Sequence, residues 1–152
     1  MPTSTLQARE QIITALGAAT VQISFSVACL GAAHELLDEA TADRLEADLF
    51  RPVQRALGRA KRANTAFAGR YGLTAPTREA PSPGLPSQGV KSFVEKAVTA
   101  AGEASRRIAE LQDSMLPIEA GDPELRASLA ETRALVDELG VPAREFLRTL
   151  GR

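Results

Sequence analysis

The strongest structural signal in the chain is the uncharged segment 11–33, which reads QIITALGAATVQISFSVACLGAA. Apolar residues recur in and just beyond it at steps of three and four, which is the spacing of a helix face packed against neighbours. The series, with Thr20 filling one position, is Ile13, Leu16, Ile23, Val27, Leu30, His34 and Leu37. It predicts a long helix from about residue 5 to residue 37, roughly 50 Å in length.

The apolar steps fail after this helix, so we expect the chain to turn between Asp38 and Asp43, with Thr41 or Asp43 capping the next helix. A second stripe begins at Leu45 and continues to Phe67. Pro52 lies inside this stripe and predicts a kink or a short preceding turn, because proline cannot donate a helical hydrogen bond.

Two further helices are predicted after residue 87. The first covers about residues 87–115, and Ser92 with Glu95 three positions later is a candidate capping box for its start. The second begins at Asp122-Pro123, a capping carboxylate followed by proline at the first helical position, and runs to about Leu139. A last short apolar helix contains Phe146, Leu147 and Leu150.

Residues 73–87, LTAPTREAPSPGLPS, form the linker-like stretch, with four prolines and one glycine. At full extension they reach about 45 Å, enough to cross the bundle or to loop back at one end, so the direction of the next helix stays open. The predicted fold is all-α: a four-helix bundle with long helices and a short C-terminal fifth helix. We expect a single domain over residues 1–152, with the Pro-rich loop 73–87 between two helical hairpins.

Composition argues against several classes of protein. One cysteine and one histidine exclude a disulfide framework and a zinc finger, and a net charge of −1 gives the whole chain no strong preference for polyanions or membranes. The sequence contains no phosphate-binding glycine motif, no nucleophile elbow and no Glu-x-x-His pair of the ferritin type. We therefore expect no enzymatic activity, no catalytic residues, no metal site and no cofactor.

His34 and Cys29 each allow a functional and a structural interpretation. His34 precedes Asp38 by four residues, so the two share a helix face and suit either a metal or pH-sensitive site or a helix-end histidine bonded to a carboxylate. No basic residue adjoins Cys29 in the sequence to lower its pKa. The structural interpretations are preferred for both residues: a bonded histidine and a small buried thiol.

Charge is distributed unevenly. Residues 1–48 carry two basic and seven acidic groups, residues 49–79 seven basic and one acidic, and residues 80–152 nine basic and eleven acidic. Five arginines fall in one sector of about 80° at the helical repeat, and they are Arg44, Arg51, Arg55, Arg59 and Arg62. They indicate either a solvated helix face, the preferred interpretation, or a binding surface for nucleic acid or an acidic protein.

The first helix has a second apolar side, opposite its main stripe. It consists of Ala18, Val21, Phe25, Cys29, Ala32 and Leu36. Small residues at Gly17, Ser24 and Gly31 run between the two sides and allow another backbone to approach. These features predict self-association as a two-fold homodimer. The competing account is that the short C-terminal helix covers this side within one chain.

The uncharged segment is also long enough to span a bilayer, but its Thr, Ser and Gln residues and the missing basic flank favour the central helix of a soluble bundle. Ser26 three residues before Cys29 likewise disfavours a lipoprotein signal. We expect a cytoplasmic protein, and the excess of Arg and Ala is typical of a GC-rich bacterium. The favoured function is a non-enzymatic interaction or adaptor protein acting through self-association and partner binding. The alternative is a polyanion-binding module.

Overall fold

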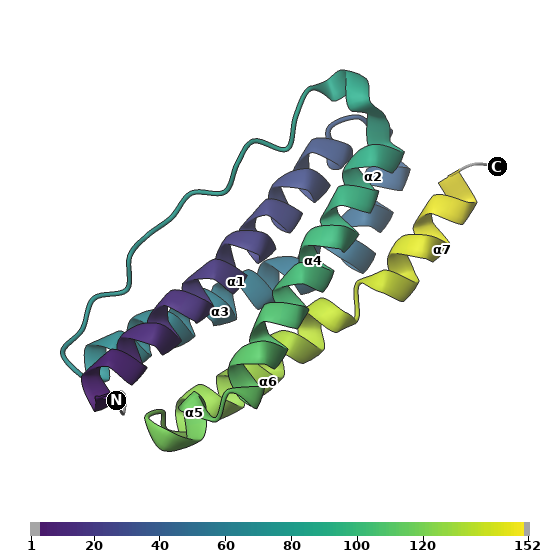
Figure 1. Cartoon of the computed structure of the whole chain (residues 1–152). Helices are drawn as coiled ribbons and strands as arrows, with labels where there is room; N and C mark the ends of the chain where they lie inside the picture. The colour runs from purple at the N-terminus through teal and green to yellow at the C-terminus, as the bar shows by residue number, and fades with distance from the viewer. Residues whose placement is uncertain (1–3, 151–152) are drawn as a thin grey trace.

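The computed structural model describes residues 4–150, which form helices and loops without a strand. Four long helices make the predicted bundle, and a short helix follows them (Figure 1). The long helices are α1 (Thr5–His34), α3 (Arg51–Arg70), α4 (Gly89–Asp113) and α6 (Pro123–Asp137). The shorter elements are α2 (Glu39–Leu45), a π-helical turn (Glu46–Phe50), a 3-10 turn (Pro86–Gln88), α5 (Leu116–Glu119) and the C-terminal α7 (Gly140–Leu150).

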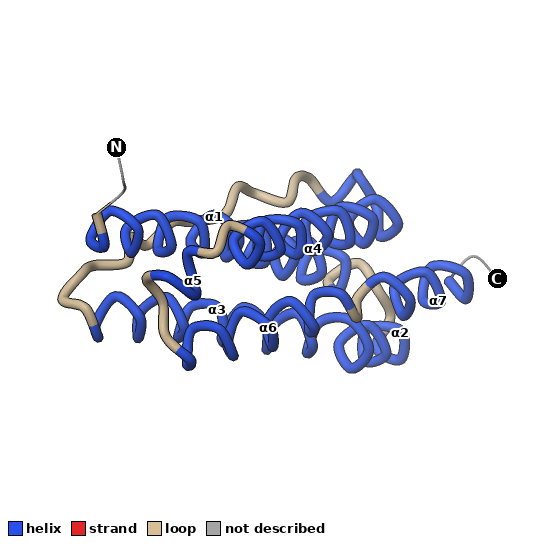
Figure 2. Tube along the Cα trace, turned by 60° about the horizontal axis from the view of Figure 1, so that its bottom comes forward, coloured by secondary structure: helices blue, strands red, loops and turns tan. Residues whose placement is uncertain are grey.

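The long helices pack in two layers, α1 with α4 and α3 with α6 (Figure 2). α1 also packs on α3, and α4 also packs on α6. Between α3 and α4 the chain crosses the bundle from end to end as an extended loop (Figure 1). Helices α3 and α4 therefore run in the same direction, and each is antiparallel to α1 and α6. This crossover supplies the helix direction that the sequence leaves open.

The core consists of two apolar clusters, one toward each end of the bundle. The cluster near the start of α1 includes Ile12, Leu16 and Phe67, and the other includes Ile23, Leu30 and Phe93. Four residues of the predicted stripe of α1 are buried, as expected from their spacing, and they are Ile13, Leu16, Ile23 and Leu30. Fully burying one such side chain contributes about 1.5–3 kcal/mol, so this face of α1 is a major source of stability.

α1 and α4 meet through small side chains. The buried Ser26 hydroxyl donates a hydrogen bond of 2.8 Å to the Ala97 carbonyl oxygen, which joins the two helices in the core. Ala100, Ala101 and Ala104 continue the buried face of α4. Because these side chains are short, the two helix axes can lie close together, and this is why α1 and α4 form an extensive interface.

Several helix ends differ from the sequence predictions. The turn after α1 occupies residues 35–38, earlier than predicted, because Asp38 caps α2 by accepting from the Thr41 amide at 2.8 Å. The predicted Ser92–Glu95 capping box is wrong: α4 already begins at Gly89, after the 3-10 turn, and its start has no side-chain cap. The Asp122 cap of α6 is confirmed by its bond of 2.8 Å from the Leu125 amide.

Pro52 causes a local change of helix type rather than a break. The π-helical turn precedes it, and the Arg51 amide bonds to the Glu46 carbonyl oxygen, five residues back. The wider turn suits a proline at the second position of α3, since proline donates no hydrogen bond to the preceding turn. The irregularity predicted at Pro52 is therefore present as a π-turn.

By length and composition, α1 is also the one described helix that is apolar enough to cross a membrane. In the bundle it contacts α4 in its own layer and α3 in the other layer. Ten of its residues are buried, including Ser26 and Cys29. This is the arrangement expected for the central helix of a bundle.

Candidate functional site

The five predicted arginines do not all belong to one helix. Arg51, Arg55, Arg59 and Arg62 lie on α3, whereas Arg44 lies on α2. The Arg44 guanidinium donates to the Thr149 hydroxyl of α7 at 2.7 Å and lies 5.7 Å from the Phe146 ring. Arg44 therefore helps to attach α7, and the candidate anion-binding surface is reduced to α3.

α3 carries six basic residues and no acidic residue. Three of the six are engaged by acids of neighbouring elements. Arg59 pairs with Glu131 of α6 and is only half-exposed, Arg70 pairs with Asp122 and Glu124, and Arg51 lies 3.9 Å from Glu46. Within residues 4–150, Arg55, Lys61 and Arg62 take part in no ion pair, and all three are exposed. We call Arg55, Arg59 and Arg62 the basic face of α3.

A hollow of about 170 Å³ lies beside this face, between α3 and α6. It is lined by Arg59, Arg62, Arg70, Glu124 and Ser128, among others. Glu124 is already paired with Arg70 at 3.0 Å. The Arg59 Nε is buried without an acceptor among the described residues, so this arginine retains an unused hydrogen-bond donor. Of the three arginines that line the hollow, Arg62 is the one that takes part in no ion pair within residues 4–150, so its guanidinium is the group there that is available to an anion.

The second apolar side of α1 is only partly covered. Cys29 is fully buried, Ala18, Val21, Phe25 and Ala32 are half-buried, and Leu36 is 42% exposed. Phe25 packs on the core and its ring centre lies 6.0 Å from the Lys96 Nζ of α4. The covering elements include α4 and the crossover loop, while α7 packs on α4 and the π-turn. Of the small residues, Gly17 faces Asn64 of α3 and Gly31 faces open space.

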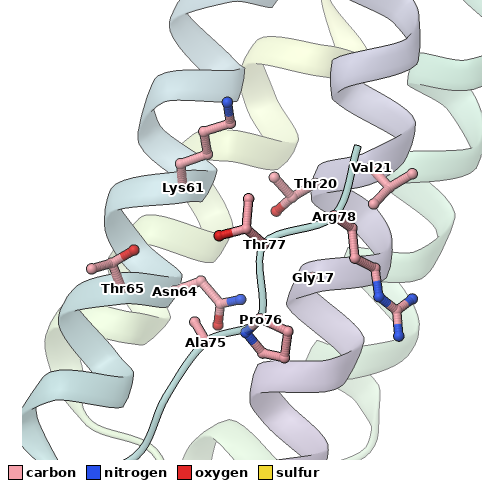
Figure 3. A pocket seen from close by; sticks show the side chains of 10 residues that line it. All are labelled: Gly17, Thr20, Val21, Lys61, Asn64, Thr65, Ala75, Pro76, Thr77 and Arg78. Carbon is pink, nitrogen blue, oxygen red and sulfur yellow. The ribbon is translucent and has the colours of Figure 1, made fainter. Parts of the chain in front are cut away.

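A second hollow of about 180 Å³ lies between α1, α3 and the crossover loop (Figure 3). α1 supplies Gly17, Thr20 and Val21, α3 supplies Lys61, Asn64 and Thr65, and the loop supplies residues 75–78. The Asn64 side chain extends from α3 toward α1, where its Nδ2 donates to the Ile13 carbonyl oxygen at 3.2 Å. Its Oδ1 is buried and has no partner among the described residues, a situation that costs about 1–3 kcal/mol.

Neither His34 nor Cys29 lies in surroundings that indicate a reactive or metal-binding site. The His34 Nε2 lies 4.0 Å from a carboxylate oxygen of Glu46, not beside Asp38, which caps α2. Burial raises the pKa of the Cys29 thiol, and the nearby Lys96 charge, which lowers it, does not cancel this effect. The thiol is therefore poorly suited to act as a nucleophile.

The single crossover is a connectivity that ferritin-like di-metal proteins also use. Their metal ligands project from facing helices into the bundle. Here the buried polar residues between the helices are Ser26, Asn64 and Thr132. Across the part of the chain that the structure describes, no group of three His, Cys, Asp or Glu side chains is placed to hold a metal ion.

No family model, curated protein or solved structure matches the chain. The function must therefore be inferred from the surfaces described above. Sequence reasoning identified Arg55, Arg59 and Arg62 but missed Lys61, Asn64 and Arg78. Asn64 was detectable as a polar residue next to the buried stripe of α3. Lys61 and Arg78 were not detectable as neighbours, because only the path of the crossover loop brings them to one hollow.

Proposed function

We propose that the protein is a non-enzymatic interaction protein that binds an anionic partner surface through the basic face of α3. The observation that carries this proposal is the absence of any acidic residue on α3 together with the exposed side chains of Arg55 and Arg62, which take part in no ion pair within residues 4–150. An arginine without a protein partner retains donors that match phosphate and carboxylate oxygens. The hollow beside Arg62 provides space for such a group.

The partner is either a nucleic acid or an acidic protein surface. The exposed side of α3 presents no aromatic side chain for base stacking, since Phe67 is buried. Contacts to nucleic acid would therefore be made to phosphates, with little sequence preference. Binding should weaken steeply with salt, with a logarithmic slope of about −2 to −3 if two or three phosphates are neutralised.

The test is the double substitution Arg55→Glu/Arg62→Glu, measured by fluorescence anisotropy with labelled DNA and with polyglutamate at low salt. The matched control is Arg126→Glu/Arg144→Glu, which makes the same change of net charge on α6 and α7 at exposed arginines that take part in no ion pair within residues 4–150. We expect the first variant to abolish binding and the control to retain it. Both melting temperatures should stay nearly unchanged, since exposed charges contribute about 0–1 kcal/mol.

Arg59 is left unchanged in this test because it pairs with Glu131. Arg59→Glu would place the new carboxylate beside that of Glu131 and destabilise the fold. A loss of binding could then not be distinguished from a loss of stability. The proposal is wrong if the wild-type chain binds neither probe at low salt. It is also wrong if the control variant loses binding as completely as the α3 variant does.

Self-association is the second candidate function. It is supported by two separate hollows on the surface of α1 and α4, one beside the half-buried Phe25 and one beside the half-buried Ala18, and by Leu36, which is exposed just after α1. A second copy of the chain would remove the remaining apolar surface of these residues from water. Under this second proposal the protein is a cytoplasmic homodimer, and α1 contributes to the interface between the two copies.

A further inference from the structure

The hollow between α1, α3 and the crossover loop has an unbalanced charge. Lys61 and Arg78 are the two charged residues that line it, and neither takes part in an ion pair within the described residues 4–150. No aspartate or glutamate belongs to its lining. Figure 3 places the two cations on opposite sides of the loop, Lys61 on α3 and Arg78 against α1. In this view the ammonium of Lys61 and the guanidinium of Arg78 both extend away from the loop, and because both side chains are exposed, each can rotate toward an anionic group in the hollow.

Two residues of the lining, Asn64 and Thr20, carry oxygens that can accept a hydrogen bond. Asn64 is only 6% exposed, and its Oδ1 has no donor among the described residues. The Thr20 hydroxyl donates its proton to the Leu16 carbonyl oxygen at 2.7 Å, so toward the hollow it can act only as an acceptor. These two oxygens favour a ligand that carries a hydrogen-bond donor as well as a negative charge.

Two further threonines complete the lining. Thr65 of α3 and Thr77 of the loop make no side-chain hydrogen bond within the described chain, and the Thr77 hydroxyl is directed toward α3 (Figure 3). Each of these hydroxyls can rotate to donate to a carboxylate or to accept from a hydroxyl. The hollow thus combines two cations, two fixed acceptors and two adaptable hydroxyls.

Its size limits the ligand further. The volume of about 180 Å³ lies below the range of about 300–1,000 Å³ that is usual for pockets of drug-sized ligands. Phosphate sites are commonly built from backbone amides at a helix N-terminus, whereas side chains in the middle of α1 and α3 line this hollow. A small carboxylate fits these features better than a phosphate.

We propose that this hollow binds a small hydroxycarboxylate, with the carboxylate between Lys61 and Arg78 and a hydroxyl directed at Asn64. The hydroxyl would donate to the unpartnered Oδ1, and Thr77 of the loop would contact the bound molecule. This site is separate from the basic face of α3, whose proposed role depends on Arg55 and Arg62. Either proposal can fail while the other holds.

The test is a titration of the full chain with D-glycerate and with propionate, followed by amide chemical shifts in nuclear magnetic resonance spectra. Propionate is the matched probe because it has the same charge and chain length but no hydroxyl. We expect saturable shifts at Thr20, Thr65 and Thr77, with glycerate bound more tightly than propionate. Inorganic phosphate serves as a third probe and should bind more weakly than glycerate.

Variants assign the roles of the side chains. Lys61→Gln and Arg78→Gln should each weaken glycerate binding by about tenfold, the usual effect of losing one charged hydrogen bond. Arg144→Gln on α7 removes an exposed cation outside the hollow and should leave binding unchanged. Asn64→Leu should remove the preference for glycerate over propionate, because it removes the acceptor of the hydroxyl.

Three results would overturn the proposal. The first is the absence of saturable shifts with glycerate at millimolar concentrations. The second is an equal loss of affinity in Lys61→Gln and Arg144→Gln, which would indicate general charge attraction. The third is phosphate binding as tight as that of glycerate. Lys61 and Arg78 are exposed, so these variants decide the question even if Asn64→Leu fails to fold.

Discussion

Asp122 is the residue at which the end of α3 and the start of α6 are joined. Its carboxylate accepts from the Leu125 amide at 2.8 Å, from the Arg70 Nε at 2.8 Å and from the Tyr71 hydroxyl at 2.9 Å. Partial burial raises the pKa of Asp122, but the hydrogen bonds from Arg70, Leu125 and Tyr71 outweigh it and hold the pKa below its ordinary value. Ionised Asp122 therefore stabilises the folded state.

The sign of the resulting pH dependence follows from this lowered pKa. The contribution of Asp122 is fully present above about pH 4, the ordinary range of an aspartate, and is lost as the pH falls through the lower folded-state pKa. Asp122→Asn keeps an N-cap acceptor but cannot ionise, so we expect a loss of about 1–2 kcal/mol at neutral pH that narrows as the pH falls below about 4. Urea unfolding of both chains at neutral pH and at about pH 3 measures this difference. The prediction would be contradicted if the difference in unfolding free energy between the two chains were the same at both pH values.

For single residues, interactions between neighbours in the sequence could be predicted, whereas interactions between residues far apart in the sequence could not. The capping role of Asp122 follows from the Asp-Pro pair, since a cap involves residues only three positions apart. Its bond to Arg70 joins residues 52 positions apart. The periodicity of α3 places Arg59 on the side away from its apolar stripe, and its side chain is half-exposed. Its pairing with Glu131 depends on how α6 lies against α3, which periodicity does not specify.

Among the elements, the crossover loop has the fewest internal restraints. Residues 74–82 donate no backbone hydrogen bond to any described residue, and Arg78 is exposed. Limited trypsin digestion should therefore cut first after Arg78, because a protease needs an extended, accessible segment. Mass spectrometry of the first fragments identifies the site. Arg78→Gln should delay the first cut, and an earlier cut within α3 would show that the helix opens more readily than the loop.

The existence of each long helix could be predicted, whereas several of their ends could not. A stripe of apolar residues over many turns is a strong signal, and all four long helices form where such stripes occur. Ends depend on a few competing caps. Asp38 caps α2 ahead of Thr41 and Asp43, and the turn at Pro86 starts α4 before Ser92 can cap it. The stripe alone does not rank such alternatives.

For the whole molecule, the proposed homodimer gives a direct prediction. The wild-type chain should sediment as a dimer, and Phe25→Glu should sediment as a folded monomer with an unchanged helical circular dichroism spectrum. The new carboxylate would lie near Lys96, which limits the cost of the substitution to the monomer. Val141→Glu, at a residue of α7 that is 69% exposed, is the matched control and should remain dimeric. A monomeric wild type, or an unfolded Phe25→Glu chain, would contradict the proposal.

The arrangement of the helices was the least predictable level. Four amphipathic helices and a loop of known length allow either an end loop or a crossover, because both bury the same stripes. The crossover places loop residues beside Lys61 and over Asn64, and this placement creates the hollow between α1 and α3. The candidate small-molecule site therefore depends on topology, whereas the basic face of α3 depends on the sequence of one helix.

The crossover loop also divides the chain into two halves that are joined covalently at one exposed place. One half contains α1 and α3, the other contains α4 and α6, and the interfaces between them include the long one from α1 to α4. A cut in the loop would leave those interfaces intact but would turn an intramolecular association into a bimolecular one. Because the intact loop links the two halves, each half experiences the other at a high effective concentration. At low concentration a nicked chain would fall apart into its two hairpins, although no contact in its core had changed.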